Sequence, residues 1–183
     1  MTGDDLKKFG DEPEVVDIDE VDQRILEVLQ DDCKTSLARI GEIVGLSAPS
    51  VVERVKKLEQ SGVIRGYHAI LDARRLGLDL TAFIGVSINY PKMIRAFEKD
   101  VAAIPEVMEC HHVTGEHSLL LKVKSRNTAS LEALISTLRS IDGVLRTDTM
   151  VVFSTRAERT QLPLTKFAPG GAGKRRKASR DRE

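Results

Sequence analysis

The sequence predicts an α+β protein in two parts, an N-terminal winged helix-turn-helix and a C-terminal ferredoxin-like βαββαβ sandwich domain. Two observations carry this prediction. In the first third, apolar residues recur every three or four positions, which is the period of one helix face. In the second half, a strand-helix-strand pattern repeats after 37 residues, so that Ala82 corresponds to Leu119.

Composition and charge divide the chain further. Residues 1–32 carry 12 acidic and 3 basic side chains, whereas residues 33–75 carry 8 basic and 4 acidic ones. A polyanionic partner is therefore expected at the second of these stretches. We predict five segments: an acidic disordered head (1–16), a helix-turn-helix domain (17–72), a linker (73–78), a ferredoxin-like domain (79–165) and a basic disordered tail (166–183).

The basic tail contains the run Lys174–Lys177 after a Gly-rich stretch. Two interpretations of this run stay open. It can be a solvated tail without a partner, or an arm that adds non-specific contacts to phosphates.

The first ordered block is expected to contain three helices. The first shows Ile18, Val21, Ile25 and Leu29 on one face. The second covers residues 37–44, between a capping Ser36 and a terminating Gly45. The third follows a tight turn, and its features are a cap, a first-turn proline and an apolar inner face: Ser47, Pro49, Val51, Val55 and Leu58.

After the third helix the apolar period changes to two. Residues 63–71 alternate, with Gly66 near the middle. This pattern predicts a small β-hairpin, the wing of the helix-turn-helix.

The second block predicts two β-α-β units in tandem. Ala82, Ile84 and Val86 alternate as a strand, and Phe97 and Val101 lie on one face of a following helix. The arrangement is a four-stranded antiparallel sheet with both helices on one face. Because the other face has no helix, a second subunit is its simplest cover, and we expect a homodimer at least.

Two short helices joined by a tight turn are typical of a helix-turn-helix, whose second helix enters the major groove of DNA. Small residues at its start can approach base edges, and basic residues one or two turns later can reach a guanine or phosphates. We expect Arg54 on the outer face, opposite Val51. The candidate DNA-binding residues are Ser36, Ser47, Ala48, Pro49, Ser50, Arg54, Lys56 and Lys57. The alternative is a plain three-helix subdomain with solvated lysines.

At this point the sequence resembles a known family. The pattern formed by Leu46-Ser47, Val51, Arg54-Val55, Leu58-Glu59 and Gly62-Val63-Ile64 is similar to the DNA-binding domain of Lrp/AsnC transcriptional regulators. The second block resembles the family's regulatory domain through Val113-Thr114-Gly115 and Leu120-Leu121-Lys122-Val123. The resemblance covers about residues 17–165.

The resemblance implies a regulator that binds double-stranded DNA and forms dimers, often assembled into octamers. It also implies a small-molecule effector, an amino acid, bound near the turn between the two middle strands. Carried over to this sequence, the candidate effector residues are Thr114, Gly115, Glu116, His117, Ser118, Thr147 and Thr149. The family's usual Gly-Asp-Tyr-Asp is altered here, since Glu116, His117 and Ser118 follow the glycine.

The sequence leaves two other functions open. An architectural protein that compacts DNA without an effector is one alternative, and a sirohaem-decarboxylase-like enzyme of the same architecture is another. We predict no metal and no cofactor, because adjacent strand residues such as His111 and His112 point to opposite faces. We predict no enzyme and no catalytic residue, because the basic recognition helix is intact. No apolar run approaches the roughly 18 residues needed to span a bilayer, and the acidic N-terminus does not look like a signal peptide. The two cysteines lack metal-site spacing, so we expect a cytoplasmic protein with reduced thiols.

Overall fold

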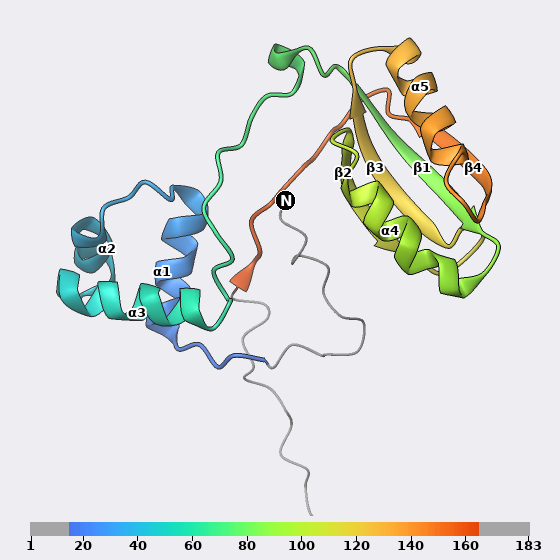
Figure 1. Ribbon diagram of the computed structural model, residues 1–183. Coiled ribbons are helices and arrows are strands. Elements are labelled where there is room, and N and C mark those ends of the chain that lie inside the picture. The colour runs from blue at the N-terminus through green and yellow to red at the C-terminus, as the bar shows by residue number, and fades with distance from the viewer. Residues whose placement is uncertain (1–14, 165–183) are drawn as a thin grey trace, which may run out of the picture. The chain divides into compact units, whose positions relative to one another are not determined.

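The computed structural model describes residues 15–164 (Figure 1). Within this range the chain forms two compact units. The helical unit contains residues 15–69 and 159–164, and the sheet unit contains residues 70–158. The expectation of a disordered basic tail lies outside the described residues, as does that of the acidic head except for its last two residues.

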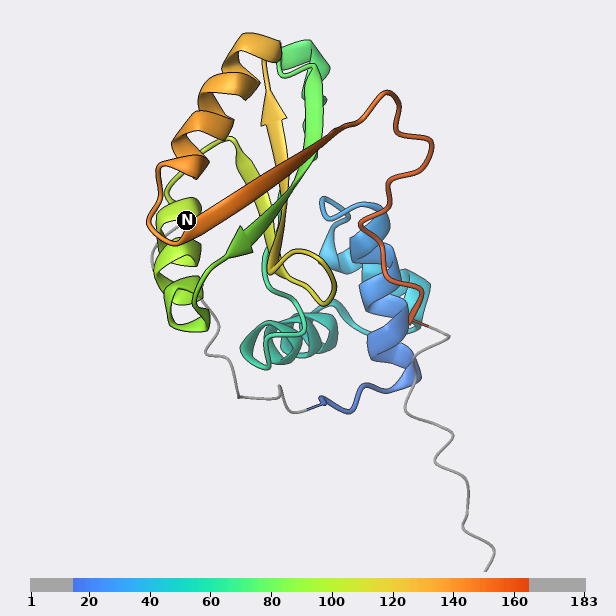
Figure 2. The ribbon, with the colours of Figure 1, turned by 90° about the vertical axis from the view of Figure 1, so that its right-hand side faces the viewer.

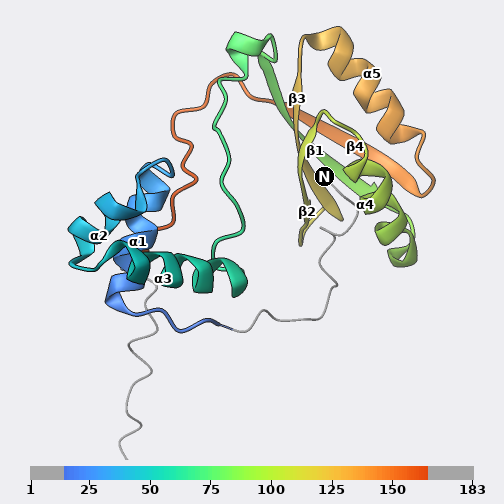
Figure 3. The same ribbon diagram turned by 60° about the vertical axis from the view of Figure 1, so that its left-hand side comes forward.

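The helical unit consists of α1 (Glu20–Asp31), α2 (Leu37–Val44) and α3 (Ala48–Gln60), shown again from another side in Figure 3. The predicted caps are present, since the side chains of Ser36 and Ser47 accept backbone N–H bonds at the starts of α2 and α3. Gly45 ends α2 with φ 72°, a left-handed conformation that costs glycine little. These signals explain the tight turn between α2 and α3.

The core of the helical unit is small and aliphatic. It takes one stripe from each helix, and its buried members are Ile25, Leu26, Ile40, Val51, Val55 and Leu58. The start of α1 adds a polar contribution through a capping box, in which Asp19 accepts the Asp22 N–H at 2.8 Å.

The predicted β wing is wrong. Residues 63–71 contain no strand, and Ile64 donates its N–H to the carbonyl of Leu58 at the end of α3. Ile70 and Leu71 are exposed, so the apolar side chains at the end of this segment are not packed as they would be in a paired strand. Its alternating pattern describes an extended chain that lacks a partner within the described residues.

The sheet unit has the predicted βαββαβ order: β1 (Leu80–Ile88), α4 (Ile94–Ala102), β2 (Val107–His112), β3 (Leu119–Ser125), α5 (Thr128–Arg139) and β4 (Val144–Val151). Its four strands are antiparallel in the order β2-β3-β1-β4. Two short 3-10 turns precede β1 and α4, at Arg74–Leu76 and Pro91–Met93.

Helices α4 and α5 lie on the same face of the sheet, as Figures 2 and 3 show from two sides. The core lies between them and the strands, and its buried members are Ala82, Ile84, Val86, Phe97, Val101, Leu119, Leu121, Val123, Leu131, Leu134 and Leu138. Within the sheet unit, no helix covers the other face. We call it the open face.

Candidate nucleic-acid interface and ligand turn

The start of α3 is small, polar and exposed. Ser47, Pro49 and Ser50 are all exposed, and the two serine hydroxyls lie 2.9 Å apart. The Ser47 hydroxyl also accepts the N–H of Ser50 as the helix cap. Ala48 is half-buried beside them. A helix start of this kind can approach a groove closely and still offer hydroxyl groups.

The outer face of α3 continues from this start. The residues opposite the buried Val51, Val55 and Leu58 are exposed, and they are Pro49, Glu53, Lys56 and Gln60. Lys57 is exposed beside them, and Val52 is 41% exposed on the other flank. Val52, Glu53 and Gln60 were not in the predicted set, although the same helical period that identified the inner face could have found them.

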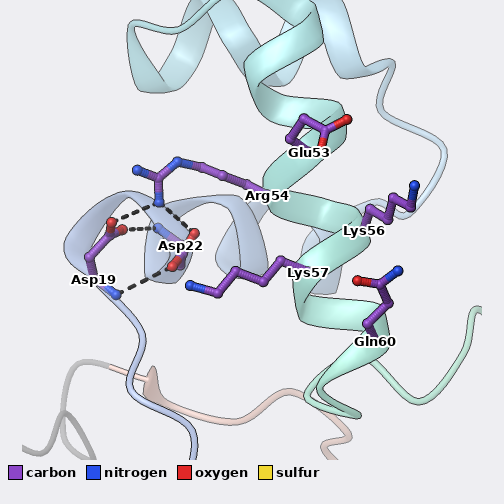
Figure 4. Close-up of a pocket in the computed structure, with 7 residues that line it drawn as sticks. All are labelled: Asp19, Asp22, Glu53, Arg54, Lys56, Lys57 and Gln60. Atoms are coloured by element: carbon purple, nitrogen blue, oxygen red, sulfur yellow. Dashed lines mark hydrogen bonds and ion pairs between the residues drawn. The ribbon is translucent and has the colours of Figure 1, made fainter.

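Arg54 does not point outward as predicted. Figure 4 shows its guanidinium turned toward the start of α1, where Nη1 lies 2.7 Å from Oδ2 of Asp19 and 2.7 Å from Oδ1 of Asp22. Asp22 is nearly buried, whereas Asp19 is about half-exposed. The reason is helical geometry, because position 54 is three residues after Val51 and four before Leu58 and so borders the inner face.

This ion pair changes the electrostatics of the α1–α3 contact. The N–H of Asp22 and then the Arg54 guanidinium lower the pKa of Asp19, and the two carboxylates raise the pKa of Arg54. The charge of Arg54 is therefore balanced within the helical unit. Lys56 and Lys57 line the same open hollow, and no ion pair with a carboxylate is present for them among the described residues.

The remaining predicted DNA-binding residue is Ser36. It is exposed, and its hydroxyl accepts the N–H of Arg39 at 3.2 Å as the cap of α2. The first turn of α2 thus presents a helix N-terminus, which favours anions such as phosphate.

The turn between β2 and β3 contains Thr114–Ser118 and is tied to the sheet at its end. The N–H of Val113 donates to the carbonyl of Ser118, and the N–H of Ser118 donates to the carbonyl of Val86. The Ser118 hydroxyl also accepts a hydrogen bond from the N–H of Ile88 at 3.3 Å. The Ser118 end of this turn is fixed, whereas Thr114, Gly115 and Glu116 are exposed.

His117 lies against the open face of the sheet. Its Nδ1 is 3.3 Å from the Ser87 hydroxyl, and its Nε2 is 3.6 Å from Oδ2 of Asp148. The ring occupies the space beside Gly85, where a Cβ would lie 2.7 Å from ring atom Cγ. Because Gly85 has no side chain, the His117 ring can pack against β1.

Two ion pairs join the turn to β4. Arg146 Nη1 lies 3.0 Å from Glu116, and Arg146 Nε lies 2.8 Å from Oδ2 of Asp148. Asp148 is the first cause, and Glu116 a lesser one, of a raised pKa of Arg146. Asp148 Oδ2 is shielded from solvent but has no well-aligned hydrogen bond. The neighbours of this oxygen are Arg146 Nε and, at 3.6 Å, Nε2 of His117.

Thr147 and Thr149 are not part of this cluster, which corrects the predicted placement. They pair with Val86 and Ile84 in register, and those residues face the helices. The Thr147 hydroxyl accepts from Arg139 Nε at 2.8 Å under α5. The β4 residues that meet the turn are their neighbours Arg146 and Asp148, because successive strand residues alternate between faces.

Two further observations concern metal ligands and membrane spans. Between residues 15 and 164, no three His, Cys, Asp or Glu side chains are grouped as a metal ion would require. His111 instead contacts Glu109 at 3.0 Å. In the same range, no helix has the length and apolar character needed to cross a bilayer.

Two family models match the chain. The AsnC-type helix-turn-helix domain matches residues 18–59, and the Lrp/AsnC ligand binding domain matches residues 81–162. The HTH-type transcriptional regulator FL11 of Pyrococcus horikoshii is 36% identical over 149 residues, which is 81% of this chain and 98% of that protein. The chain belongs to the Lrp/AsnC family.

Further relatives agree with this assignment. The regulatory protein AsnC of Haemophilus influenzae is 36% identical over 73% of this chain and 90% of its own length. Among solved structures, AsnC of E. coli is similar with a TM-score of 0.75 and 30% identity, covering 79% of this chain and 97% of that one. This Lrp/AsnC member is therefore a transcriptional regulator with a DNA-binding domain and a ligand-binding domain.

A solved structure with a ligand is also similar. A transcriptional regulator of Neisseria meningitidis, in complex with L-Met, matches with a TM-score of 0.78 and 32% identity, covering 81% of this chain and 98% of that one.

Proposed function

We propose that this Lrp/AsnC regulator reads duplex DNA with the outer face of α3, and that an amino acid bound at the turn 114–118 changes its DNA affinity or its assembly. The observation that carries the first half is the exposed face of α3, with hydroxyls at its start and two lysines further along. Its other side holds the helix in the core.

Each residue on this face has a chemistry suited to DNA. Ser47 and Ser50 can bond base edges or phosphates, and Val52 can contact a thymine methyl group. Lys56 and Lys57 provide phosphate contacts, as does the N-terminus of α2 at Ser36. Arg54 is assigned a different role, because its ion pairs set the position of α3 against α1.

The test of DNA reading compares three variants on an operator defined by footprinting. Lys56→Gln should weaken binding to all sequences and lower the salt slope by about 0.9, since one phosphate contact is lost. Ser50→Ala should reduce discrimination between the operator and a scrambled duplex. Lys99→Gln, on α4 of the sheet unit, is the control. If Lys56→Gln and Ser50→Ala both bind like the control, α3 is not the DNA-reading helix.

The second half of the proposal is supported by the chemistry of the turn. An amino acid needs an anionic partner for its ammonium group and N–H or cationic donors for its carboxylate. Asp148 and Glu116 can serve the ammonium group, and Arg146 can serve the carboxylate. The L-Met complex of the similar Neisseria regulator supports an amino acid as the ligand class.

The experiment is an operator titration with each of the twenty amino acids, repeated with Asp148→Asn and with Thr147→Ser as the control. We expect one or a few amino acids to shift DNA affinity by about 5- to 150-fold in the parent and the control, the usual range of allosteric coupling. Asp148→Asn should lose the shift. If the parent responds to no amino acid while still binding DNA, the protein is an architectural DNA-binding protein instead.

The open face supports an assembly of several copies. It combines Phe83 and the exposed Met150 with the charged cluster around Lys122, which contacts Glu109 and Glu158 at 3.0 and 2.8 Å. A sheet with one uncovered face is stabilised when a second sheet packs on it. We therefore propose a homodimer, built on this face, as the unit from which any larger assembly such as an octamer forms.

A further inference from the structure

Residues 159–164 pack with the helical unit rather than with the sheet unit that precedes them, so the structure differs from the predicted boundary at residue 165. The side-chain amide of Gln30, at the end of α1, makes hydrogen bonds to both the N–H and the carbonyl of Leu162. Its Oε1 accepts the Leu162 N–H at 2.7 Å, and its Nε2 donates to the Leu162 carbonyl at 3.2 Å. Gln161 adds a bond from its own amide to the Gln30 carbonyl at 3.1 Å.

An apolar contact completes this attachment, which we call the Gln30 clamp. Leu164 packs against the core of the helical unit. The Leu162 side chain is 67% exposed, so the clamp holds the segment by its backbone and by Leu164. Three hydrogen bonds and one apolar anchor fix the point at which the chain continues into residues 165–183.

The sequence beyond the clamp is strongly basic. Residues 166–183 carry 7 basic and 2 acidic side chains, and the run Lys174–Lys177 contains four consecutive cations. The Lrp/AsnC ligand-binding match ends at residue 162, so this charge belongs to no part of the family pattern.

Chain length shows what the clamp contributes. Ten residues separate Leu164 from Lys174, and they can span at most about 35 Å. Helix α3, which belongs to the same unit as Leu164, is about 20 Å long. Counted from Glu158, where the sheet unit ends, 16 residues separate that unit from Lys174, and the limit is about 55 Å. The clamp therefore keeps the basic run within reach of DNA bound at α3.

We propose that the Gln30 clamp anchors the basic tail to the helix-turn-helix unit, so that Lys174–Lys177 bind phosphates of the same duplex that α3 reads. The proposal rests on the proposed DNA binding by α3. The partner is the sugar-phosphate backbone beside the operator, recognised by charge and without regard to sequence.

The test is a cycle of four full-length proteins: the parent, a charge variant with Lys174, Arg175, Arg176 and Lys177 all replaced by Gln, the clamp variant Gln30→Ala, and their combination. Each is titrated with the operator and with a scrambled duplex across a salt series. Gln23→Ala is the matched control, because Gln23 lies two turns earlier on α1 and its side chain makes no hydrogen bond among the described residues. Alanine keeps the helix propensity high in both variants.

We expect the charge variant to lose about tenfold in affinity for both duplexes and up to about 3 to 4 in salt slope. Gln30→Ala should lose about threefold, because a longer tether lowers the effective concentration of the tail. In the Gln30→Ala background, the four Gln replacements should then reduce DNA affinity by a smaller factor than in the parent. A second clamp variant, Leu164→Ala, should repeat this coupling, and thermal unfolding shows whether either variant remains folded.

Two results would overturn the proposal. If the charge variant lowers DNA affinity by the same factor with and without the clamp, the tail is not anchored by Gln30. If it changes neither affinity nor salt slope, the tail is not a phosphate-binding arm. In both cases Lys56→Gln still tests α3 separately. If Lys56→Gln also leaves DNA affinity and the salt slope unchanged, the proposed DNA binding by α3 has failed, and not only the role of the tail.

Discussion

The helical unit and the sheet unit reach stability by different means. The helical unit has a small aliphatic core, and polar side chains fix its helices at their ends: the Asp19–Asp22 capping box, the ion pairs of Arg54 and the Gln30 clamp. The sheet unit has the larger core, whose largest fully buried side chain is Phe97, but it leaves one face of its sheet open.

The difference bears on where each unit is proposed to meet its partners. In the helical unit, contacts on the inner side of α3 leave the outer side, the proposed DNA face, exposed. In the sheet unit, the two helices stabilise one face, and the proposed sites for a second copy and a ligand are the opposite face and the turn beside it. The stabilising contacts and the proposed recognition surfaces thus lie on opposite faces in both units.

The largest expected effect tests whether the two units are stable independently. Ile40→Ala removes a fully buried side chain from the small core and should destabilise the helical unit by about 2–5 kcal/mol. We expect loss of DNA binding together with a separate, unchanged thermal transition for the sheet unit. Calorimetry of the full chain measures both transitions. A single transition, lowered as a whole, would show that the units unfold together.

The next effect concerns the open face. Phe83→Glu places a carboxylate where a second copy is proposed to pack, and it should weaken self-association by about 100-fold. Lys122 lies opposite Phe83 in the register, so the new carboxylate has a cationic neighbour in the isolated subunit. Leu145→Glu, at the register irregularity of β4 and already 65% exposed, is the control. Sedimentation equilibrium decides, and an unchanged mass for Phe83→Glu would place the interface elsewhere.

Arg54→Ala should lower the free energy of unfolding of the helical unit by about 1–3 kcal/mol, because the nearly buried Asp22 loses its cationic partner. The loss should depend on pH. Arg54 helps to hold the pKa of Asp19 below its ordinary 3.8, so this stabilisation is present above about pH 4 and disappears as the pH falls through the lowered value. Thermal unfolding of parent and variant across pH measures the difference.

The same variant distinguishes positioning from DNA contact. If Arg54 only positions α3, Arg54→Ala leaves the salt slope of DNA binding unchanged at temperatures where the unit is folded. A slope lowered by about 0.9 would mean that Arg54 contacts a phosphate.

Local signals explain what could be predicted from the sequence. Ser36, Gly45 and Ser47 mark the ends of α2 and α3 because caps depend on neighbouring residues only. The sheet was predictable because its two halves repeat, and a repeated pattern of strand and helix leaves few possible arrangements.

The failures depend on distant partners. Arg54 contacts Asp19 and Asp22, 35 and 32 residues earlier, and no local pattern indicates this pairing. The face on which Thr147 lies depends on the register between β4 and β1, which includes an irregularity at Ser87/Ile88. The Gln30 clamp joins residues 132 positions apart and was not predicted at all.

The smallest expected effect concerns the segment that was predicted to be a wing. The Tyr67 hydroxyl donates to Oε1 of Glu59 at 3.0 Å, a contact between this segment and the end of α3. Burial, and then Glu59, raise the pKa of Tyr67 to about 12. Tyr67→Phe should therefore lower the free energy of unfolding by at most about 1 kcal/mol, since one largely exposed hydrogen bond is lost. Guanidinium unfolding measures it, with Tyr90→Phe as the control.

The pH dependence of this bond gives a sharper measurement than its free energy. Because the folded pKa lies above the ordinary 10.0, the contribution is complete below pH 10 and is lost as the pH rises toward 12. The sequence has only two tyrosines, so in Tyr90→Phe the tyrosinate absorbance reports Tyr67 alone. Glu59→Gln in that background should lower the midpoint of the titration, because a neutral amide no longer opposes the tyrosinate charge. A midpoint near 10 before and after Glu59→Gln would show that residues 63–71 are not held against α3 in solution.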